Sequence, residues 1–209
     1  MSKGLQPFGG GRVERRAADL YPTHPAGSVA FMRAEGEILR TRFPVLWEPA
    51  CGPGFMAKVL ALHGFEVVAS DAFDHGFGAA GVDFLATTEA EAPALVTNPP
   101  YDDLAEAFIR HAVMTLRLPY VAMLLKSSYW HCGRGVTLWP SVTPSVIYPL
   151  GFRLHWTDGG APPETHSWMV WDVERPPIDG VTARLMPALP KPASWPDLGF
   201  DDYVRRIAA

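Results

Sequence analysis

The sequence has few cysteines, no excess of positive charge and no long apolar run, and each shortage argues against a class of protein. Cys51 and Cys132 are the only two cysteines; they lie far apart without CxxC or His-rich spacing, so neither a disulfide framework nor a metal site is expected. The formal net charge of −4 means that bulk charge cannot provide sequence-independent binding of nucleic acid. The longest apolar stretches, such as residues 120–125, fall short of the ~18 residues that span a bilayer, and the N-terminus has no apolar signal region. Together these features predict a cytoplasmic protein without a membrane partner.

The length and composition predict one globular domain. The chain has 209 residues, of which 48% are hydrophobic and 19% charged, and this balance is typical of a protein with a packed core. We expect residues 1–18 to be flexible and residues 19–175 to form the domain. Residues 176–209 are rich in proline and predict an extended arm that ends in a short helix from Asp201.

Alternating strands and helices predict an α/β fold with a doubly wound, mainly parallel, Rossmann-like sheet. Apolar runs predict strands at residues 45–47, 66–70, 94–97 and 120–126, and helical periodicity follows at residues 55–63 and 104–116. Ser28 is the expected N-cap of the first helix. Late strands are expected at residues 146–148, 152–156 and 167–171, and these would include an antiparallel hairpin at the C-terminal edge.

A glycine-rich turn, Glu48-Pro49-Ala50-Cys51-Gly52-Pro53-Gly54, follows the first predicted strand. Gly52 and Gly54 allow positive φ and close approach of a ligand, and the helix that follows offers unpaired backbone N–H groups. The next strand ends at Asp71, 17 residues after Gly54, where nucleotide-binding βαβ units carry an acidic residue for the ribose diol. Because neither GxGxxG nor GxxxxGK[ST] is present, the pattern favours an adenosyl ligand without phosphates.

Two later segments suit a planar nitrogen-containing group. Asp83 and Phe84 would lie at the tip of a short third strand, where they could bind an adenine amine and ring; a surface aspartate and a core phenylalanine explain them equally well. Asn98-Pro99-Pro100-Tyr101 follows the strand at residues 94–97. Its amide offers a donor and an acceptor, its prolines restrict the backbone, and its tyrosine offers a stacking face.

With the glycine turn after the first strand, an aspartate after the second and NPPY after the fourth, the chain resembles the Rossmann-like S-adenosylmethionine (SAM) methyltransferases. It is most similar in pattern to small phage-type DNA adenine-N6 methyltransferases with the NPPY motif. This resemblance implies a mainly parallel seven-stranded sheet with one antiparallel strand, and SAM as the cofactor. It implies the following cofactor contacts: Glu48, Pro49, Cys51, Gly52 and Gly54 for the methionine and sugar, Asp71 for the ribose, and Asp83 and Phe84 for the adenine. Residues 19–25 look like the N-terminal motif of the family, which would bring Tyr21 and Thr23 to the same cofactor.

By the same resemblance, Asn98, Pro99, Pro100 and Tyr101 are the catalytic residues. Hydrogen bonds to Asn98 and to the Pro99 carbonyl would localise the lone pair of an exocyclic amine, and Tyr101 would stack on an adenine rotated out of the duplex. Adenine in DNA is the leading acceptor. Adenine in RNA and a glutamine amide in a protein are alternatives, because NPPY suits any planar amide or amine. An alternative from another class is a nonenzymatic subunit that binds SAM.

Overall fold

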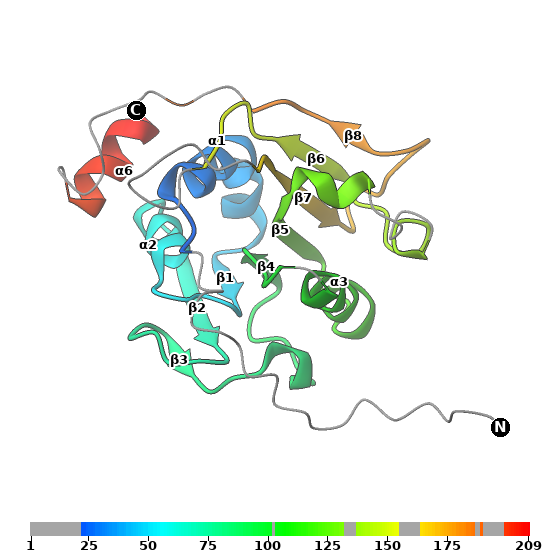
Figure 1. The fold of residues 1–209 in the computed structure, drawn as a ribbon, viewed down its shortest axis with the longest axis horizontal. Coiled ribbons are helices and arrows are strands. Elements are labelled where there is room, and N and C mark those ends of the chain that lie inside the picture. Colours follow the sequence, from blue (N-terminus) through cyan, green and yellow to red (C-terminus); the bar gives the residue numbers. More distant parts are fainter. Residues whose placement is uncertain (1–21, 102, 132–136, 155–163, 187–188, 190–198) are drawn as a thin grey trace.

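The chain forms an eight-stranded sheet with helices on both faces (Figure 1). The computed structural model describes residues 22–101, 103–131, 137–154, 164–186, 189 and 199–209. The segment at residues 1–18, which is expected to be flexible, lies outside this part of the chain. Among the described residues, no helix has the length and apolar character needed to cross a bilayer.

The sheet has the order β3-β2-β1-β4-β5-β7-β6-β8. All paired neighbours are parallel except β7, which runs antiparallel to both β5 and β6. The mainly parallel sheet with an antiparallel pair towards its C-terminal edge is therefore confirmed. The strands are β1 Val45–Glu48, β2 Glu66–Asp71, β3 Ala79–Ala80, β4 Ala94–Thr97, β5 Tyr120–Lys126, β6 Val146–Pro149, β7 His166–Asp172 and β8 Thr182–Ala183.

Four α-helices accompany the described strands. They are α1 Pro25–Arg42, α2 Phe55–Leu62, α3 Asp103–Arg110 and α6 Phe200–Ala208. A π-helical turn, His111–Thr115, continues α3, and two short 3₁₀ helices occupy Phe84–Ala86 and Ser127–His131. The helix predicted at residues 104–116 is therefore split into an α and a π segment.

The start of α1 differs from the prediction. Ser28 was the expected N-cap, but it is buried inside the helix, which begins at Pro25. His24 is the N-cap, and its Nδ1 accepts a hydrogen bond from the Ala26 backbone N–H at 3.2 Å. Proline is favoured in the first turn because its missing N–H would have no helical partner there, so Pro25 and not Ser28 marks the helix start.

The C-terminal third contains two further corrections. The strand predicted at residues 152–156 does not form in its described part, residues 152–154. Leu154 is buried instead, with its side chain 3.2 Å from the position that a Gly27 Cβ would occupy. Within the predicted arm, β8 pairs with β6, so the sheet has eight strands and not the seven that the resemblance implied.

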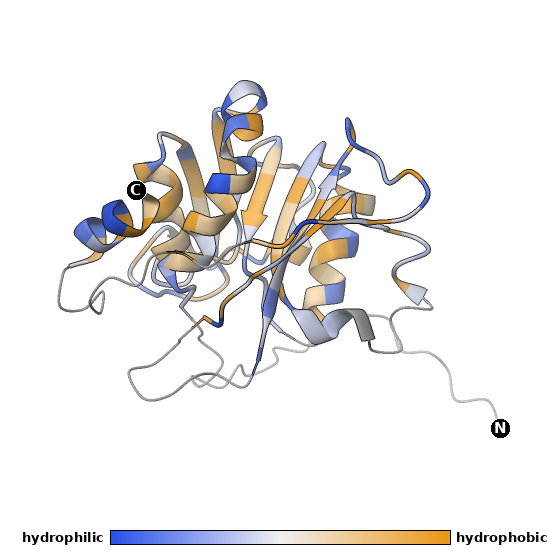
Figure 2. Ribbon diagram, turned by 90° about the horizontal axis from the view of Figure 1, so that it is seen from above, coloured by the Kyte–Doolittle hydropathy of each residue, from blue (hydrophilic) through white to orange (hydrophobic). Residues whose placement is uncertain are grey.

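The sheet separates two apolar layers. One packs against α1, α2 and α6 and the other against α3 (Figure 1). All six residues of β5 from Tyr120 to Leu125 are buried, as expected for a central strand that is covered on both faces. In Figure 2 the central strands are largely hydrophobic, whereas the outward side of the C-terminal helix is hydrophilic.

Helix α6 belongs to the core. Tyr203, Val204 and Ile207 are buried in the same apolar layer as α1. The Arg33 side chain donates a hydrogen bond to the Ile207 carbonyl at 3.0 Å. The end of the predicted arm is thus packed against the first helix of the domain.

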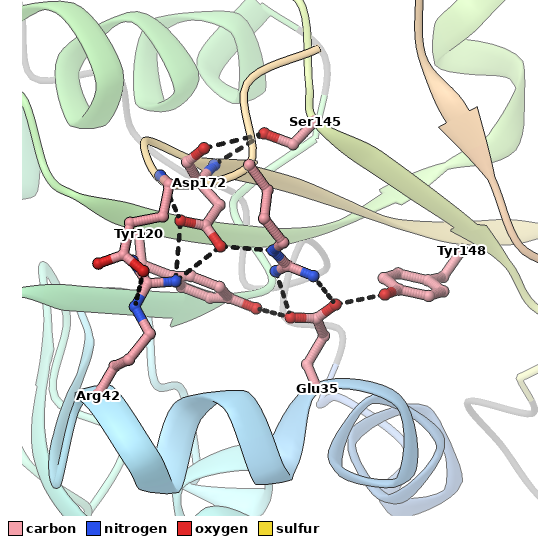
Figure 3. Close-up of polar contacts among 8 residues, drawn as sticks. Glu35, Arg42, Tyr120, Ser145, Tyr148 and Asp172 are labelled. Atoms are coloured by element: carbon pink, nitrogen blue, oxygen red, sulfur yellow. Dashed lines mark hydrogen bonds and ion pairs between the residues drawn. The ribbon is translucent and has the colours of Figure 1, made fainter. Parts of the chain in front are cut away.

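A buried polar network connects α1 to the amino end of β5 (Figure 3). Glu35 is fully buried and accepts hydrogen bonds from the hydroxyls of Tyr120, at 2.9 Å, and Tyr148. Arg175 donates to both Glu35 oxygens, at 2.9 and 2.6 Å, and to Asp172 at 2.6 Å. Burial and the Glu35 carboxylate raise the pKa of Tyr148 to about 12. The network holds its acidic and phenolic groups with internal partners.

Asp172 forms the second half of this network. Arg42 donates to both of its carboxylate oxygens, at 2.9 and 2.8 Å. Ser145 contacts the Asp172 backbone, accepting from its N–H at 3.0 Å. Burial alone would raise the pKa of Asp172, but the hydrogen bonds from Arg42 and Arg175 outweigh it and lower that pKa. Helix α1 is therefore held to β5 through Glu35 and Tyr120, and to β7 through Arg42 and Asp172.

Candidate functional site at the carboxyl edge of the sheet

The candidate site lies where β2, β1 and β4 end. These strands are parallel neighbours, so their carboxyl ends share one edge, the usual place for ligands in open α/β sheets. Four buried side-chain oxygens at this edge have no hydrogen-bond partner among the described residues: Glu48 Oε2, Ser70 Oγ, Thr97 Oγ1 and Asn98 Oδ1. Buried polar atoms are nearly always hydrogen-bonded in folded proteins, so this edge has the capacity to bind a polar ligand.

The glycine turn has the backbone geometry that its composition predicts. Gly52 and Gly54 have φ values of 51° and 80°, which residues with a Cβ rarely adopt. The Cys51 backbone N–H donates to the Ser70 carbonyl at 3.0 Å, which holds the turn beside the end of β2. Gly54 is the N-cap of α2, so the turn leads directly into a helix N-terminus.

Asp71 connects the glycine turn to the loop that follows β2. It is 5% exposed, and its two oxygens accept hydrogen bonds from the backbone N–H groups of Gly52, at 3.0 Å, and Phe73, at 2.9 Å. His75 Nε2 lies 3.7 Å from Asp71 Oδ1. A carboxylate has about four lone-pair positions, so Asp71 retains acceptor capacity while it orders the turn.

Glu48 and Cys51 are both influenced by burial. Burial raises the pKa of Glu48 well above its ordinary value, with Asp71 adding to the effect and a hydrogen bond from the Ala57 backbone opposing it. Burial, together with Glu48 and Asp71, raises the pKa of the Cys51 thiol to about 12. This raised pKa favours the protonated thiol near neutral pH, which argues against a nucleophilic role for Cys51.

Phe77 also contacts this turn, although no sequence motif predicts it. Its ring atoms lie 2.3–2.6 Å from the position that a Cβ on Gly54 would occupy, so the ring packs directly on the glycine turn. Its carbonyl oxygen lies 3.6 Å from the Cys51 sulfur as a hydrogen-bond acceptor. Gly76 and Gly78 flank Phe77, and both have positive φ. This pair of glycines is the sequence signal from which the fold of the loop back onto the turn could have been predicted.

The NPPY segment lies at the end of β4, as its position in the sequence predicts. Asn98 is half-buried, Pro99 is buried, and Pro100 and Tyr101 are half-buried. The Tyr101 hydroxyl lies 3.5 Å from His166 Nε2, at the start of β7. Lys126 Nζ, at the end of β5, lies 4.6 Å from the centroid of the Tyr101 ring. His166 and Lys126 are not predicted at this site by any local pattern, because only strand pairing brings them to Tyr101.

Asp83 and Phe84 take separate positions beyond the end of β3. Asp83 is exposed and caps the 3₁₀ helix by accepting from the Leu85 N–H at 3.0 Å. Phe84 is 2% exposed and packs between Trp47 and Phe108, with ring centroids 5.2 and 4.6 Å away. The sequence allowed either an adenine-binding pair or a surface aspartate beside a core phenylalanine. The surroundings of Asp83 and Phe84 match the second explanation.

The N-terminal motif is described only in part. Tyr21 lies outside the described residues, and Thr23 is buried directly before the N-cap of α1. The first turn of α1 is held near the carboxyl half of β5, because Trp168 Nε1 donates to the Gly27 carbonyl at 2.9 Å and Trp168 pairs with Leu124. Thr23 therefore lies towards the same end of the sheet as the NPPY segment. Pro49 is buried within the glycine turn.

Neither a protein-family model nor a curated protein sequence matches this chain. Solved structures do match. A Listeria monocytogenes protein assigned to the class I SAM-dependent methyltransferases aligns with 95% of this chain and 75% of its own, at 13% identity and a TM-score of 0.60. A Pyrococcus horikoshii protein assigned as an RNA methyltransferase aligns with 70% of this chain and 79% of its own, at 12% identity and a TM-score of 0.51.

The M protein of the type I restriction enzyme EcoKI is also similar. The alignment covers 88% of this chain but only 53% of the M protein, at 15% identity and a TM-score of 0.52. This chain thus spans about half the length of that protein. Identities this low establish similarity of fold alone. The chain has the Rossmann-like fold of these SAM-dependent methyltransferase structures.

Proposed function

We propose that this protein is a SAM-dependent methyltransferase that methylates an exocyclic amine, with adenine N6 in DNA as the leading acceptor. The observation that carries the proposal is the buried Asn98 Oδ1, which has no hydrogen-bond partner in the described part of the chain. It follows β4 in an NPPY motif and lies at the same sheet edge as the glycine turn and Asp71. An amine that donates a hydrogen bond would satisfy this oxygen.

The residues of the glycine turn fit SAM chemically. Gly52 and Gly54 permit close contact with the backbone, and Asp71 keeps acceptor capacity for a ribose diol. The Asp71 carboxylate places negative potential at this edge, which suits a ligand with an ammonium and a sulfonium group, and the Glu48 carboxyl group adds a buried oxygen that has no hydrogen-bond partner in the described structure. When bound, SAM supplies a methyl group on a positively charged sulfur. Glu48, Cys51, Gly52, Gly54 and Asp71 are the residues that we expect to hold it.

Asn98 and Pro99 would prepare the acceptor. The lone pair of an exocyclic adenine amine is delocalised into the ring, which makes the amine a poor nucleophile. Hydrogen bonds from the amine to Asn98 Oδ1 and to the Pro99 carbonyl would favour a localised lone pair and fix its direction. Transfer would form the N–CH₃ bond and break the S–CH₃ bond, so that S-adenosylhomocysteine leaves as a neutral thioether. The amine becomes acidic as it is alkylated and would release its proton to water, so this chemistry needs no strong base beside it.

Tyr101 would hold the acceptor ring. It is half-buried at the end of the NPPY segment, and stacking on an aromatic side chain stabilises an unpaired base by about 1–3 kcal/mol. A base in a duplex has to leave the stack to reach such a residue. These requirements suit adenine in DNA, and they are equally compatible with adenine in RNA or a planar glutamine amide.

The decisive experiment measures transfer of labelled methyl groups from SAM to duplex DNA, single-stranded DNA, RNA and protein, followed by identification of the methylated group. Asn98→Ala should abolish transfer while the calorimetric affinity for SAM stays within about twofold of wild type. Asn98→Asp is the matched variant for Asn98→Ala, because it keeps an acceptor oxygen at this position. A wild-type protein that binds SAM but methylates none of the four substrates would favour the nonenzymatic alternative.

Asn98 also allows a test that does not depend on turnover, because it is the only asparagine in the chain. Labelling with ¹⁵N-asparagine therefore yields one side-chain NH₂ pair in the NMR spectrum. An oligonucleotide with an unpaired adenine should shift this signal, and the same oligonucleotide with purine in place of adenine should shift it less. Equal shifts would argue against recognition of the amine by Asn98.

A further inference from the structure

The NPPY tyrosine lies against two side chains from the neighbouring strands. Lys126 is the last residue of β5 and His166 the first residue of β7, and the two are paired in the antiparallel ladder. His166 Nε2 lies 3.5 Å from the Tyr101 hydroxyl, and Lys126 Nζ lies 4.6 Å from the ring centroid. Tyr101 therefore contacts an imidazole at its hydroxyl and an ammonium group near its face.

Both contacting groups are held in place by their own surroundings. His166 is 1% exposed, and burial lowers its pKa to about 4, with Glu164 opposing the effect and Lys126 adding to it. A neutral imidazole has one nitrogen available as an acceptor, which suits a phenolic donor. Lys126 Nζ lies 2.8 Å from Glu164 Oε1, and this ion pair restrains the ammonium group beside the ring.

We infer that His166 and Lys126 are positioning residues that hold the Tyr101 ring in the orientation in which it stacks on the acceptor. This inference rests on the proposed function and deepens it. The contact between His166 Nε2 and the Tyr101 hydroxyl fixes the direction of the ring, and Lys126 packs near one face. Tyr101 itself remains half-buried, so part of its surface stays accessible to a planar acceptor.

A double-mutant cycle tests the contact between His166 and Tyr101. His166→Leu and Tyr101→Phe should each lower kcat by about 3- to 10-fold, the range of one hydrogen bond, with the Kd for SAM unchanged. The double variant should lose no more than either single variant, because both remove the same hydrogen bond. His166→Gln, which places an oxygen near the position of Nε2, should restore most of the rate. Losses that multiply in the double variant would overturn the positioning role.

His63→Leu is the matched control for loss of a histidine. His63 lies at the C-cap of α2 and its Nδ1 contacts the Val59 carbonyl at 2.8 Å, before the amino end of β2. Its substitution should leave kcat unchanged. Lys126→Met should lower kcat by about 2- to 5-fold, the range of one exposed cation–π contact. An effect of His63→Leu equal to that of His166→Leu would show that general destabilisation explains the loss and would overturn the inference.

NMR separates failure of this inference from failure of the proposed function. In protein labelled with ¹³C at the tyrosine ζ carbon, Tyr101→Phe assigns the Tyr101 signal, and His166→Leu should shift it in the absence of any substrate. An unshifted signal would overturn the positioning role whether or not the enzyme is active. If His166→Leu shifts the Tyr101 signal but the wild-type protein methylates none of the substrates, the contact between His166 and Tyr101 stands and the proposed function is overturned.

Discussion

The two ends of the sheet hold buried polar groups in opposite states of hydrogen bonding. At the amino end of β5, Glu35 and Asp172 accept hydrogen bonds from tyrosine and arginine side chains (Figure 3). At the carboxyl edge, Glu48 Oε2 and Asn98 Oδ1 are buried without a partner among the described residues. The ends of β5 are roughly 20 Å apart, so the two clusters are independent. A saturated cluster stabilises the scaffold, whereas an unsaturated one has capacity for a ligand.

The largest effect expected from this comparison is a loss of folding stability when the saturated cluster is disrupted. Glu35→Gln keeps the shape of the side chain but removes the charge that Arg175 contacts through two nitrogens. Removing one partner of a buried ion pair costs about 3–5 kcal/mol, so the free energy of unfolding in urea should fall by that amount. Glu37→Gln, an exposed glutamate on the same helix, should have no measurable effect. A loss below 1 kcal/mol for Glu35→Gln would contradict the scaffold role.

The second prediction concerns the pH dependence of stability. Burial lowers the His166 pKa to about 4 in the folded protein, whereas the unfolded chain has a histidine pKa of about 6.5. Between these values the unfolded state binds more protons, so the free energy of unfolding falls as the pH is lowered, by about 3 kcal/mol in total.

Comparison of wild type with His166→Gln isolates this contribution. Urea unfolding at several pH values between 4 and 7 should show a steeper loss of stability in wild type than in the variant, since all carboxylates titrate in both proteins. The two curves should run parallel above pH 7, where His166 is neutral in both states. Parallel curves over the whole range would show that His166 protonates as readily in the folded protein as in the unfolded chain.

The third prediction concerns the affinity for SAM. Asp71→Asn removes the carboxylate charge. It keeps one of the two oxygens that accept hydrogen bonds from the backbone N–H groups of Gly52 and Phe73. Loss of a charge-assisted hydrogen bond of about 1.5–3 kcal/mol should weaken SAM binding about 10- to 150-fold in a calorimetric titration.

Asp74→Asn is the matched control for this variant. Asp74 is exposed in the same loop and accepts only a local hydrogen bond from the Gly76 N–H, at 2.9 Å, in the contacts described. Its substitution should leave the Kd for SAM unchanged. If Asp71→Asn also bound SAM with the wild-type Kd, the assignment of Asp71 to the ribose would fall.

The smallest loss of stability is expected when glutamate is replaced by glutamine in the unsaturated cluster at the carboxyl edge. Glu48→Gln should lower the free energy of unfolding by no more than about 1 kcal/mol, because Glu48 Oε2 has no internal partner to lose in the described structure. The same variant should weaken SAM binding, measured by titration. A stability loss as large as that of Glu35→Gln would remove the distinction between the two clusters.

Much of the fold could be predicted because the strands are buried on both faces. The apolar runs at residues 94–97 and 120–126 match β4 and β5 in both bounds, since a covered central strand requires continuous apolar residues. The edge of the sheet was harder to predict. Strand β8 has two exposed residues, Thr182 and Ala183, and forms through pairing with β6, for which no local pattern is required.

The candidate site was predictable where its residues stand at the ends of predicted strands. The glycine turn and NPPY follow strands directly, so their place at the sheet edge could be deduced from the order of elements. Phe77, Lys126 and His166 come from other loops and strands, and their contacts depend on how these pack. Phe84 illustrates the limit: whether it faced a ligand or the core depended on the positions of Trp47 and Phe108.

By itself, the sequence determined the alternation of strands and helices, the positive-φ turn at Gly52 and Gly54, and the position of Asn98 after a buried strand. These features depend on local backbone preference and on burial, which residue types encode directly. Only the tertiary structure decided which buried acids are satisfied: Glu35 contacts Arg175, which is 140 positions away, whereas Glu48 Oε2 has no such partner in the described structure. Hydrogen bonds between distant residues depend on the complete packing of the chain, and that packing distinguishes the scaffold from the candidate site.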